Sequence, residues 1–378
     1  MSSAGPTESG QERADTFRTE LRRWFAANPP PARAGGGDGT EDDYDGAAVL
    51  RQRHWQRRLS RAGLAGIAWP EEYGGRGASP MQQLIFHEEH QRAGGGGNEL
   101  FFVGLGHAGP TLIEWGTEAQ RRRWLPGILD GDLIFAQCFS EPGAGSDLAA
   151  IATTAVPDGG DLVVTGQKMW STYAQYADLC ELLVRTDTDD RYGGLTYLIA
   201  DLRAPGVTVR PIRSITGRAE FCEVFFDGVR IPVDNVVGTL GQGWQVATTT
   251  LTFERSTAFA ATVIGLGAVV AELGERCSGD PVESRCVAEL ADDVHAARAL
   301  LYHCVAEQQR GRAAEAAGAL KLVATELNQR VRRYAALHDA GPVLDYLSSF
   351  GLCIGGGTSE IQRNIIAERI LRLPRDPR

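Results

Sequence analysis

The stretch Gln137-Cys-Phe-Ser-Glu-Pro-Gly-Ala-Gly-Ser-Asp147 carries most of the information about the fold of this chain. It continues the apolar run Leu133-Ile-Phe-Ala136, which is typical of a strand. Pro142 ends that strand, because its ring fixes φ and removes a backbone donor. Gly143 and Gly145 then allow the main chain to approach a ligand closely, with free N–H groups directed at it. The stretch therefore predicts a ligand-binding turn at the end of a strand.

A second informative segment, Lys168-Met-Trp-Ser-Thr172, supplies a large aromatic face and a hydroxyl two residues later. Because a strand alternates its faces, we expect Trp170 and Thr172 to point the same way. Hydroxyls and amides at the edge of a ring system, with an indole packed against it, suit a flavin. Both residues are also favoured in ordinary strands, but the upstream turn favours the flavin.

Both segments resemble the acyl-CoA dehydrogenase family. The family's flavin loop, hydroxyl-Glu-Pro-x-Ala-Gly-Ser-Asp, stands here as Ser140-Glu-Pro-Gly-Ala-Gly-Ser-Asp147, and its Trp-x-Thr signature as Trp170-Ser-Thr172. A third match is Gly356-Gly-Thr-Ser-Glu-Ile-Gln-Arg-Asn364, and Trp69-Pro-Glu-Glu-Tyr-Gly-Gly75 looks like the family's N-terminal domain. The matches occur in family order and span residues 14–375.

The resemblance implies FAD as the cofactor and an acyl-CoA as the substrate. The implied cofactor contacts are Gln137, Phe139, Ser140, Gly145, Ser146, Trp170, Ser171, Thr172, Thr358 and Glu360. The implied substrate contacts are Ser146, Arg255 and Gly356. Of these, Ser146 and Arg255 would bind coenzyme A phosphates, and the Gly356 N–H would bind the thioester oxygen, as in an oxyanion hole.

The catalytic base departs from the commonest family pattern. Many relatives have a Glu directly before the Gly-Thr-Ser of the C-terminal block, where this chain has Gly356. Other branches place that Glu in a Glu-Arg pair on the first long helix of the C-terminal domain, which corresponds here to Glu254-Arg255. Helical spacing puts Glu254 among small and apolar neighbours, which would raise its pKa and strengthen it as a base. The alternative is an ordinary exposed Glu on a helix face.

Periodicity along the chain predicts a helical, then β-rich, then helical organisation. We expect helices in the first part over 43–62, 79–93 and 110–128. Short strands are predicted at 133–139, 162–166, 179–186, 194–201, 207–210 and 222–229. Helices return over 242–274, 281–310, 313–340 and 359–372. The predicted fold is α+β, with a disordered tail (1–13), an N-terminal helical domain (14–131), a middle antiparallel β-barrel domain (132–236) and a C-terminal four-helix bundle (237–378).

Composition excludes several classes of protein. The net charge is −10 and no long basic block occurs, which argues against a nucleic-acid partner. No apolar run reaches the 18 residues that a membrane span needs, so we expect no membrane partner. Seven scattered cysteines without a C-x-x-C pair favour a reduced, cytoplasmic protein without a zinc site.

Two motif-like segments have simpler explanations. Gly104-Leu-Gly-His-Ala-Gly109 spells a dinucleotide turn, but its surroundings are helical and Pro110 explains a helix start. The i,i+3 histidines of His87-Glu-Glu-His90 lack a third ligand, which indicates a solvated helix face, and we expect no metal site.

The expected function is FAD-dependent α,β-dehydrogenation of an acyl-CoA to the trans-2-enoyl thioester, with an electron-transferring flavoprotein as acceptor. The alternatives are a tailoring enzyme or oxidase acting on a carrier-protein thioester, and a half-active partner subunit of a hetero-oligomer. The C-terminal block looks most like bacterial branches that act on steroid side chains and other unusual acyl groups. Residues 274–287 lack the family's Arg-x-x-Phe-Gly segment, which in many relatives reaches a neighbouring subunit's FAD. We therefore expect an oligomer. The sequence does not distinguish a homo-oligomer from a hetero-oligomer, or a dimer from a tetramer.

Overall fold

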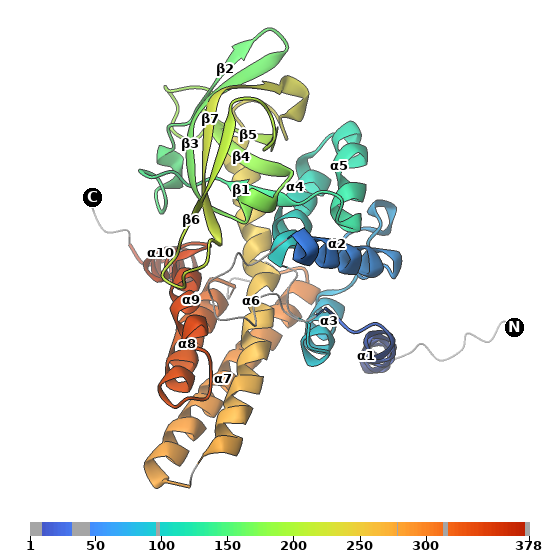
Figure 1. The fold of residues 1–378 in the computed structure, drawn as a ribbon, viewed down its shortest axis with the longest axis vertical. Helices are drawn as coiled ribbons and strands as arrows, with labels where there is room; N and C mark the ends of the chain where they lie inside the picture. The colour runs from blue at the N-terminus through green and yellow to red at the C-terminus, as the bar shows by residue number, and fades with distance from the viewer. Residues whose placement is uncertain (1–9, 32–45, 96–98, 278, 313–316, 375–378) are drawn as a thin grey trace, which may run out of the picture.

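The computed structural model describes residues 10–31, 46–95, 99–277, 279–312 and 317–374, and leaves out the side chains of residues 10, 11 and 254–258. N-terminal helices, a β-sheet and long C-terminal helices follow one another along the chain, as predicted (Figure 1). Helix α1 begins at Gly10, so residues 10–13 are helical where we predicted a disordered tail. Residues 1–9 and the Gly- and Asp-rich stretch 35–43 lie outside the described residues.

In the described part of the N-terminal region there are five α-helices: α1 (Gly10–Ala27), α2 (Gly46–Arg61), α3 (Pro80–Arg92), α4 (Gly109–Trp115) and α5 (Glu118–Asp130). The single helix predicted over 110–128 is divided, because Gly116 is extended and Thr117 starts a new helix. The Thr117 hydroxyl accepts the Gln120 N–H (3.2 Å), and the Gln120 side chain accepts the Thr117 N–H (2.9 Å). The glycine-rich stretch is a π-helix, Gly104–Ala108, that runs into α4, and so it is no strand-to-helix turn.

His90, on the histidine face of α3, is buried, and the prediction of a solvated face was wrong there. The His90 ring stacks on Phe86 and Trp55, at centroid distances of 5.7 and 6.3 Å. Burial lowers the pKa of His90 to about 4. Glu89, beside it, is also buried and binds arginines of α1. A single sequence cannot show this, because the covering residues come from α1 and α2.

The middle part is one seven-stranded sheet that forms a half-barrel. Its strands are β1 (Phe135–Cys138), β2 (Thr154–Asp158), β3 (Asp161–Thr172), β4 (Leu179–Arg185), β5 (Leu195–Asp201), β6 (Val207–Ile212) and β7 (Phe221–Pro232). The order is β1-β4-β2-β3-β7-β6, and β5 pairs with β4. Pairing is mainly antiparallel, although β4 is parallel to both β1 and β2. Strand β2 was not predicted, because Pro157 disfavours a strand and because only Ala155 of this segment is buried, which leaves no apolar alternation.

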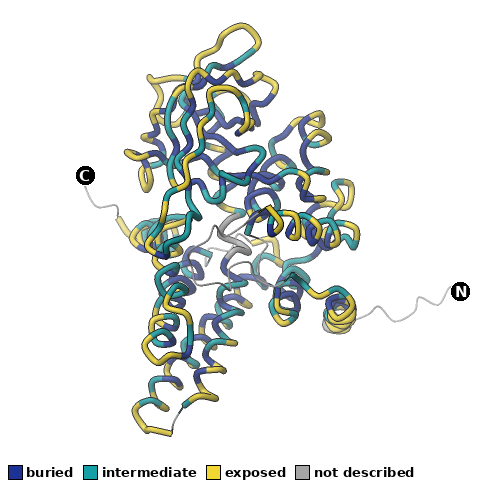
Figure 2. Tube along the Cα trace, viewed as in Figure 1, coloured by how far each residue is buried: buried dark blue, intermediate teal, exposed yellow. Residues whose placement is uncertain are grey.

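The C-terminal part contains α6 (Gly243–Arg276), α7 (Pro281–Gln309), α8 (Ala317–Leu337), α9 (Val343–Ile354) and α10 (Ser359–Ile365). A π-helical turn, Ile366–Ile370, continues α10, so the predicted helix 359–372 exists in two parts. Helix α6 runs from beside the sheet to the far end of the C-terminal helices (Figure 1). It contacts β5, the π-helix Gly104–Ala108, α7 and α8. Helix α9 was not predicted. Its sequence is apolar, yet Ser349 is its one fully covered residue (Figure 2).

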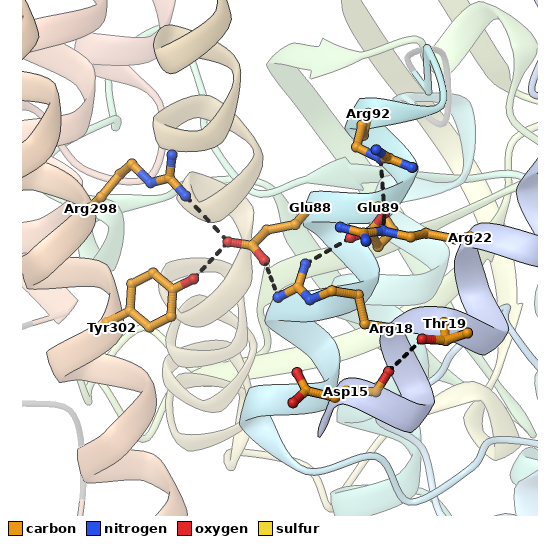
Figure 3. A network of polar contacts seen from close by, with 9 residues as sticks. All are labelled: Asp15, Arg18, Thr19, Arg22, Glu88, Glu89, Arg92, Arg298 and Tyr302. Carbon is orange, nitrogen blue, oxygen red and sulfur yellow. Dashed lines mark hydrogen bonds and ion pairs between the residues drawn. The ribbon is translucent and has the colours of Figure 1, made fainter. Parts of the chain in front are cut away.

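A polar network joins the N-terminal helices to the C-terminal ones (Figure 3). Glu88 of α3 accepts hydrogen bonds from Arg18 of α1 (2.7 Å) and from Tyr302 of α7 (2.8 Å). Arg298 of α7 lies 3.5 Å from the same carboxylate. The network therefore fixes α1, α3 and α7 relative to one another. Among the described residues, no helix has both the length and the apolar character needed to cross a membrane.

Candidate functional site

The predicted ligand-binding turn follows β1 and is tightly formed. The Glu141 N–H donates to the Ala144 carbonyl (2.9 Å), and the Ala144 N–H donates back to the Glu141 carbonyl (3.1 Å). Gly143, Gly145 and Ser146 are exposed, and a Cβ added to either glycine would meet no described atom within 4 Å. The backbone of the turn is therefore open at these glycines, and ligand binding there stays a prediction.

A buried ion pair holds this turn from behind. The Lys168 side chain is fully buried, and its Nζ donates to the Phe139 carbonyl (3.0 Å) and to Glu141 Oε1 (2.8 Å). The Glu141 carboxylate also accepts the N–H groups of Ala152 (2.6 Å) and Thr153 (2.9 Å). Burial alone would raise the pKa of Glu141, but Lys168 and these N–H groups lower it overall. The turn is thus bound to β3 and to residues 152–153.

Trp170 occupies an unusual backbone position in β3. A β-bulge lies between Lys168 and Ser171, and Trp170 has a φ of 65°, which is uncommon for a bulky residue. Its indole is 53% exposed and meets the Phe221 ring edge-on at 6.0 Å. The regular strand alternation that we assumed for Trp170 and Thr172 is therefore interrupted here. Backbone strain of this kind is concentrated at functional sites.

Ser171, Phe139 and Gln137, three of the predicted cofactor contacts, turn their side chains into the protein. The Ser171 hydroxyl is buried, 3.4 Å from the Cys138 sulfur, and the Phe139 ring is buried against Tyr197. The Gln137 amide donates to the carboxylate of Glu181 (2.7 Å). These residues can reach a ligand mainly through their backbone.

Gln137 belongs to a buried polar cluster that sequence reasoning missed. The Glu181 carboxylate accepts the Tyr197 hydroxyl at 2.6 Å, and both side chains are fully buried. Burial and the Glu181 charge raise the pKa of Tyr197 well above its ordinary value. The sequence offered one signal of this buried cluster, which is the acidic residue Glu181 inside the apolar run of β4.

A second turn, at the end of α9, carries the remaining predicted residues. Gly356 and Gly357 have φ values of 67° and 97°, the left-handed region that glycine adopts without strain. Lys321 of α8 is fully buried and donates to the Gly357 carbonyl at 2.7 Å. The Thr358 hydroxyl caps α10 by accepting the Ile361 N–H (3.2 Å). Glu360 is exposed on α10.

The predicted base and its neighbour, Glu254 and Arg255, lie in α6, but their side chains are outside the described residues. Thr250, one helical turn before Glu254, is fully buried, and its hydroxyl lies 2.8 Å from that of Thr111 in α4. This part of α6 is therefore fixed against the N-terminal helices.

A chain of contacts brings the predicted ligand-binding turn (residues 140–147) and the tryptophan segment (residues 168–172) to the C-terminal helices. The Met169 N–H donates to the Ser140 carbonyl (2.9 Å), and Trp170 contacts Phe221. The ring of Phe221 in turn lies beside α9, 3.9 Å from where a Cβ on Gly351 would be. Among the described residues, no group of three or more acidic, histidine or cysteine side chains could hold a metal ion.

Three family models match consecutive parts of the chain. They are the acyl-CoA dehydrogenase N-terminal domain (residues 11–132), middle domain (136–229) and C-terminal domain (241–371). Acyl-CoA dehydrogenase IpdE1 of Mycobacterium tuberculosis is 39% identical over 387 residues, which cover 96% of this chain and 98% of that protein.

Solved structures agree with these matches. A chain of the Tcur3481-Tcur3483 steroid ACAD superposes with a TM-score of 0.83 at 30% identity, covering 98% of this chain and 99% of that one. A chain of the ChsE4-ChsE5 complex from Mycobacterium tuberculosis superposes with a TM-score of 0.81 at 31% identity, covering 99% and 100%. Together with the geometry of the two turns, these matches establish that the chain belongs to the acyl-CoA dehydrogenase family.

Proposed function

We propose that this acyl-CoA dehydrogenase binds FAD between the flavin turn (residues 140–147) and the C-terminal turn (residues 355–358), and converts an acyl-CoA to its trans-2-enoyl thioester. One observation carries the proposal. The contacts from Ser140 through Met169, Trp170 and Phe221 reach α9, the helix that leads into the C-terminal turn.

The residues present fit a flavin. The exposed indole of Trp170 offers a flat face for a ring system, and the open backbone at Gly143 and Gly145 can donate hydrogen bonds to a cofactor. Ser140, Ser146 and Thr172 are only partly covered or exposed, so their hydroxyls remain accessible. Bound FAD would supply the acceptor for the hydride that leaves the substrate β-carbon.

The chain's own residues would handle the α-proton and the thioester. Glu254 takes the proton from the α-carbon, and the Gly356 N–H donates to the thioester oxygen as negative charge grows there. The glycine at position 356 supports this assignment, since it supplies a donor but no base. Ser146 and Arg255 contact the coenzyme A phosphates, while Thr358 and Glu360 contact the cofactor.

Electrons would leave to a protein acceptor of the electron-transferring flavoprotein type. We also infer an oligomer of two or four chains. Helix α9 exposes Val343, Phe350, Leu352 and Ile354, an apolar surface of the kind that mediates subunit contacts. Two similar structures are of proteins that pair unequal chains, Tcur3481-Tcur3483 and ChsE4-ChsE5, which supports including a hetero-oligomer.

Anaerobic mixing of the purified, FAD-loaded protein with a panel of acyl-CoAs tests the function. Steroid side-chain thioesters should bleach the visible absorbance of the flavin, in the roughly stoichiometric manner of a reductive half-reaction. Parallel assays should show turnover with ferrocenium or the acceptor flavoprotein. A folded protein that takes up no FAD would refute the proposal. Peroxide as the dominant product would indicate an oxidase, and bleaching by carrier-protein thioesters alone would indicate a tailoring enzyme.

A further inference from the structure

Lys321 is a fully buried lysine on α8 that reaches the backbone of the C-terminal turn. Its Nζ donates to the Gly357 carbonyl at 2.7 Å and to the Cys353 carbonyl at 3.3 Å. The buried Gln362 amide binds the neighbouring carbonyl, that of Gly356, at 3.0 Å. Two side chains therefore bind consecutive carbonyl oxygens of this turn.

These hydrogen bonds use only the carbonyl oxygens of the turn, so its N–H groups stay available to a ligand. The N–H groups of Gly356, Gly357 and Thr358 have no hydrogen-bond acceptor among the described residues. A hydrogen bond to a carbonyl polarises the N–H of the same peptide group, so Lys321 strengthens the Thr358 N–H as a donor and Gln362 strengthens that of Gly357. The lysine also places a positive charge beside the turn, where it favours any negative charge that develops on the bound ligand.

We propose that Lys321 is a positioning residue for dehydrogenation, which holds the C-terminal turn so that the Gly356 N–H binds the thioester oxygen. This role rests on the proposed function. Lys321 itself does not touch the substrate. It acts through the backbone of Gly356–Thr358, as Lys168 acts through the flavin turn.

The test compares Lys321→Met with Glu326→Gln in the full-length, FAD-loaded protein. Methionine keeps most of the volume of lysine but cannot donate a hydrogen bond. Glu326 lies on the same helix and makes an exposed pair with Arg363 of α10 (2.6 Å), so its variant disturbs α8–α10 contacts without touching the turn. Three quantities are measured: FAD content, amide hydrogen exchange of residues 353–362, and the rate constants for anaerobic flavin reduction.

Lys321→Met should speed exchange of residues 353–362 by about tenfold. It should slow flavin reduction at saturating acyl-CoA by about tenfold or more, with FAD content unchanged. Glu326→Gln should match the wild type in all three. Faster exchange with an unchanged reduction rate would show a merely structural lysine and overturn the proposal, as would no change in either quantity.

A second variant covers the case in which Lys321→Met does not fold. Gln362→Met removes only the neutral donor to Gly356, and it should slow flavin reduction in the same direction by a smaller factor, about threefold. Wild-type reduction by Gln362→Met would then count against the proposal. If no acyl-CoA reduces the wild-type flavin, the proposed function fails, and the exchange experiment still decides whether Lys321 holds the turn.

Discussion

Glu141 and Gly357 are each bound by a fully buried lysine, but the two lysines act on different chemical groups. Lys168 forms an ion pair with the Glu141 carboxylate inside the middle domain, whereas Lys321 donates to backbone carbonyls of the C-terminal turn. Loss of one member of a buried ion pair strands the other charge in a medium of low dielectric constant. Loss of a hydrogen bond to a carbonyl costs much less. The flavin turn is therefore held by charge and the C-terminal turn by hydrogen bonds and glycine conformation.

The largest effect is expected from Lys168→Met, which leaves the Glu141 carboxylate buried without its cation. We expect a loss of about 3–5 kcal/mol in the free energy of unfolding, together with a low FAD content. Urea denaturation and the ratio of flavin to protein absorbance measure the two effects. The matched control is Arg230→Met, which breaks exposed pairs with Asp158 and Asp161 of the same sheet. This control should lose less than about 1 kcal/mol. Equal losses of unfolding free energy in both variants would show that the buried ion pair at the flavin turn contributes no more than an exposed pair.

Glu254→Gln tests the chemistry without disturbing either turn. The amide keeps the shape of the side chain but cannot accept the α-proton, so flavin reduction should slow by about 10²-fold or more. FAD content and stability should match the wild type, in contrast with Lys168→Met. Glu272→Gln, at an exposed position on the same helix, serves as the control and should react normally. Near-wild-type reduction by Glu254→Gln would mean that another residue is the base.

Adding Gly356→Glu to that variant asks whether the C-terminal turn can accept a carboxylate. The left-handed φ of Gly356 makes any other residue cost about 1–2 kcal/mol there. We therefore expect only a small recovery of activity in the double variant. The new carboxylate can act as a base, but the substitution strains the backbone of the turn. Full recovery would show that the turn is more adaptable than its glycine geometry indicates.

Local sequence rules predicted the parts of the site that depend on local conformation. Pro142 and the glycines after it specify the turn whatever packs against them, and the order of helical and β-rich segments follows from periodicity. The contacts of the two buried lysines with the two turns could not be predicted, because they join residues distant in sequence. Lys168 and Glu141 are 27 residues apart, and Lys321 and Gly357 are 36 apart. The bulge at Trp170 likewise depends on pairing with β7. Helix α9 was missed because glycines interrupt and follow its apolar pattern, and the burial of His90 because two other helices cover it.

Lowering the pH should weaken the packing of the N-terminal helices before it weakens the ion pair at the flavin turn. In the unfolded chain His90 takes up a proton near its ordinary pKa of 6.5, whereas burial lowers its pKa to about 4 in the folded protein. The unfolded state binds more protons between these values, so stability should fall as the pH is lowered from 6.5 to 4, by up to about 1.4 kcal/mol per pH unit. The pKa of Glu141 is lowered, mainly by Lys168, so this carboxylate holds its charge, and the flavin turn its ion pair, to a lower pH than an ordinary glutamate would.

His90→Phe preserves the aromatic stacking and removes the titrating group. Urea denaturation at several pH values should give a shallower acid slope for this variant, with the flavin retained by the folded protein. Parallel curves for wild type and variant would assign the acid sensitivity to other groups, beginning with His87, whose pKa burial also lowers to about 4.

The smallest effect is expected in the polar network of Figure 3, where charges are paired but less completely buried than Lys168. Arg298 is 41% exposed and lies 3.5 Å from Glu88, which keeps bonds to Arg18 and Tyr302 when Arg298 is replaced. Arg298→Met should therefore cost no more than about 1 kcal/mol, and the loss should shrink further at high salt, because solvent ions screen an exposed pair. Denaturation at low and high ionic strength measures both quantities. A salt-independent loss as large as that of Lys168→Met would show that this network is held by buried charge as well, and the contrast between the flavin turn and the rest of the molecule would fail.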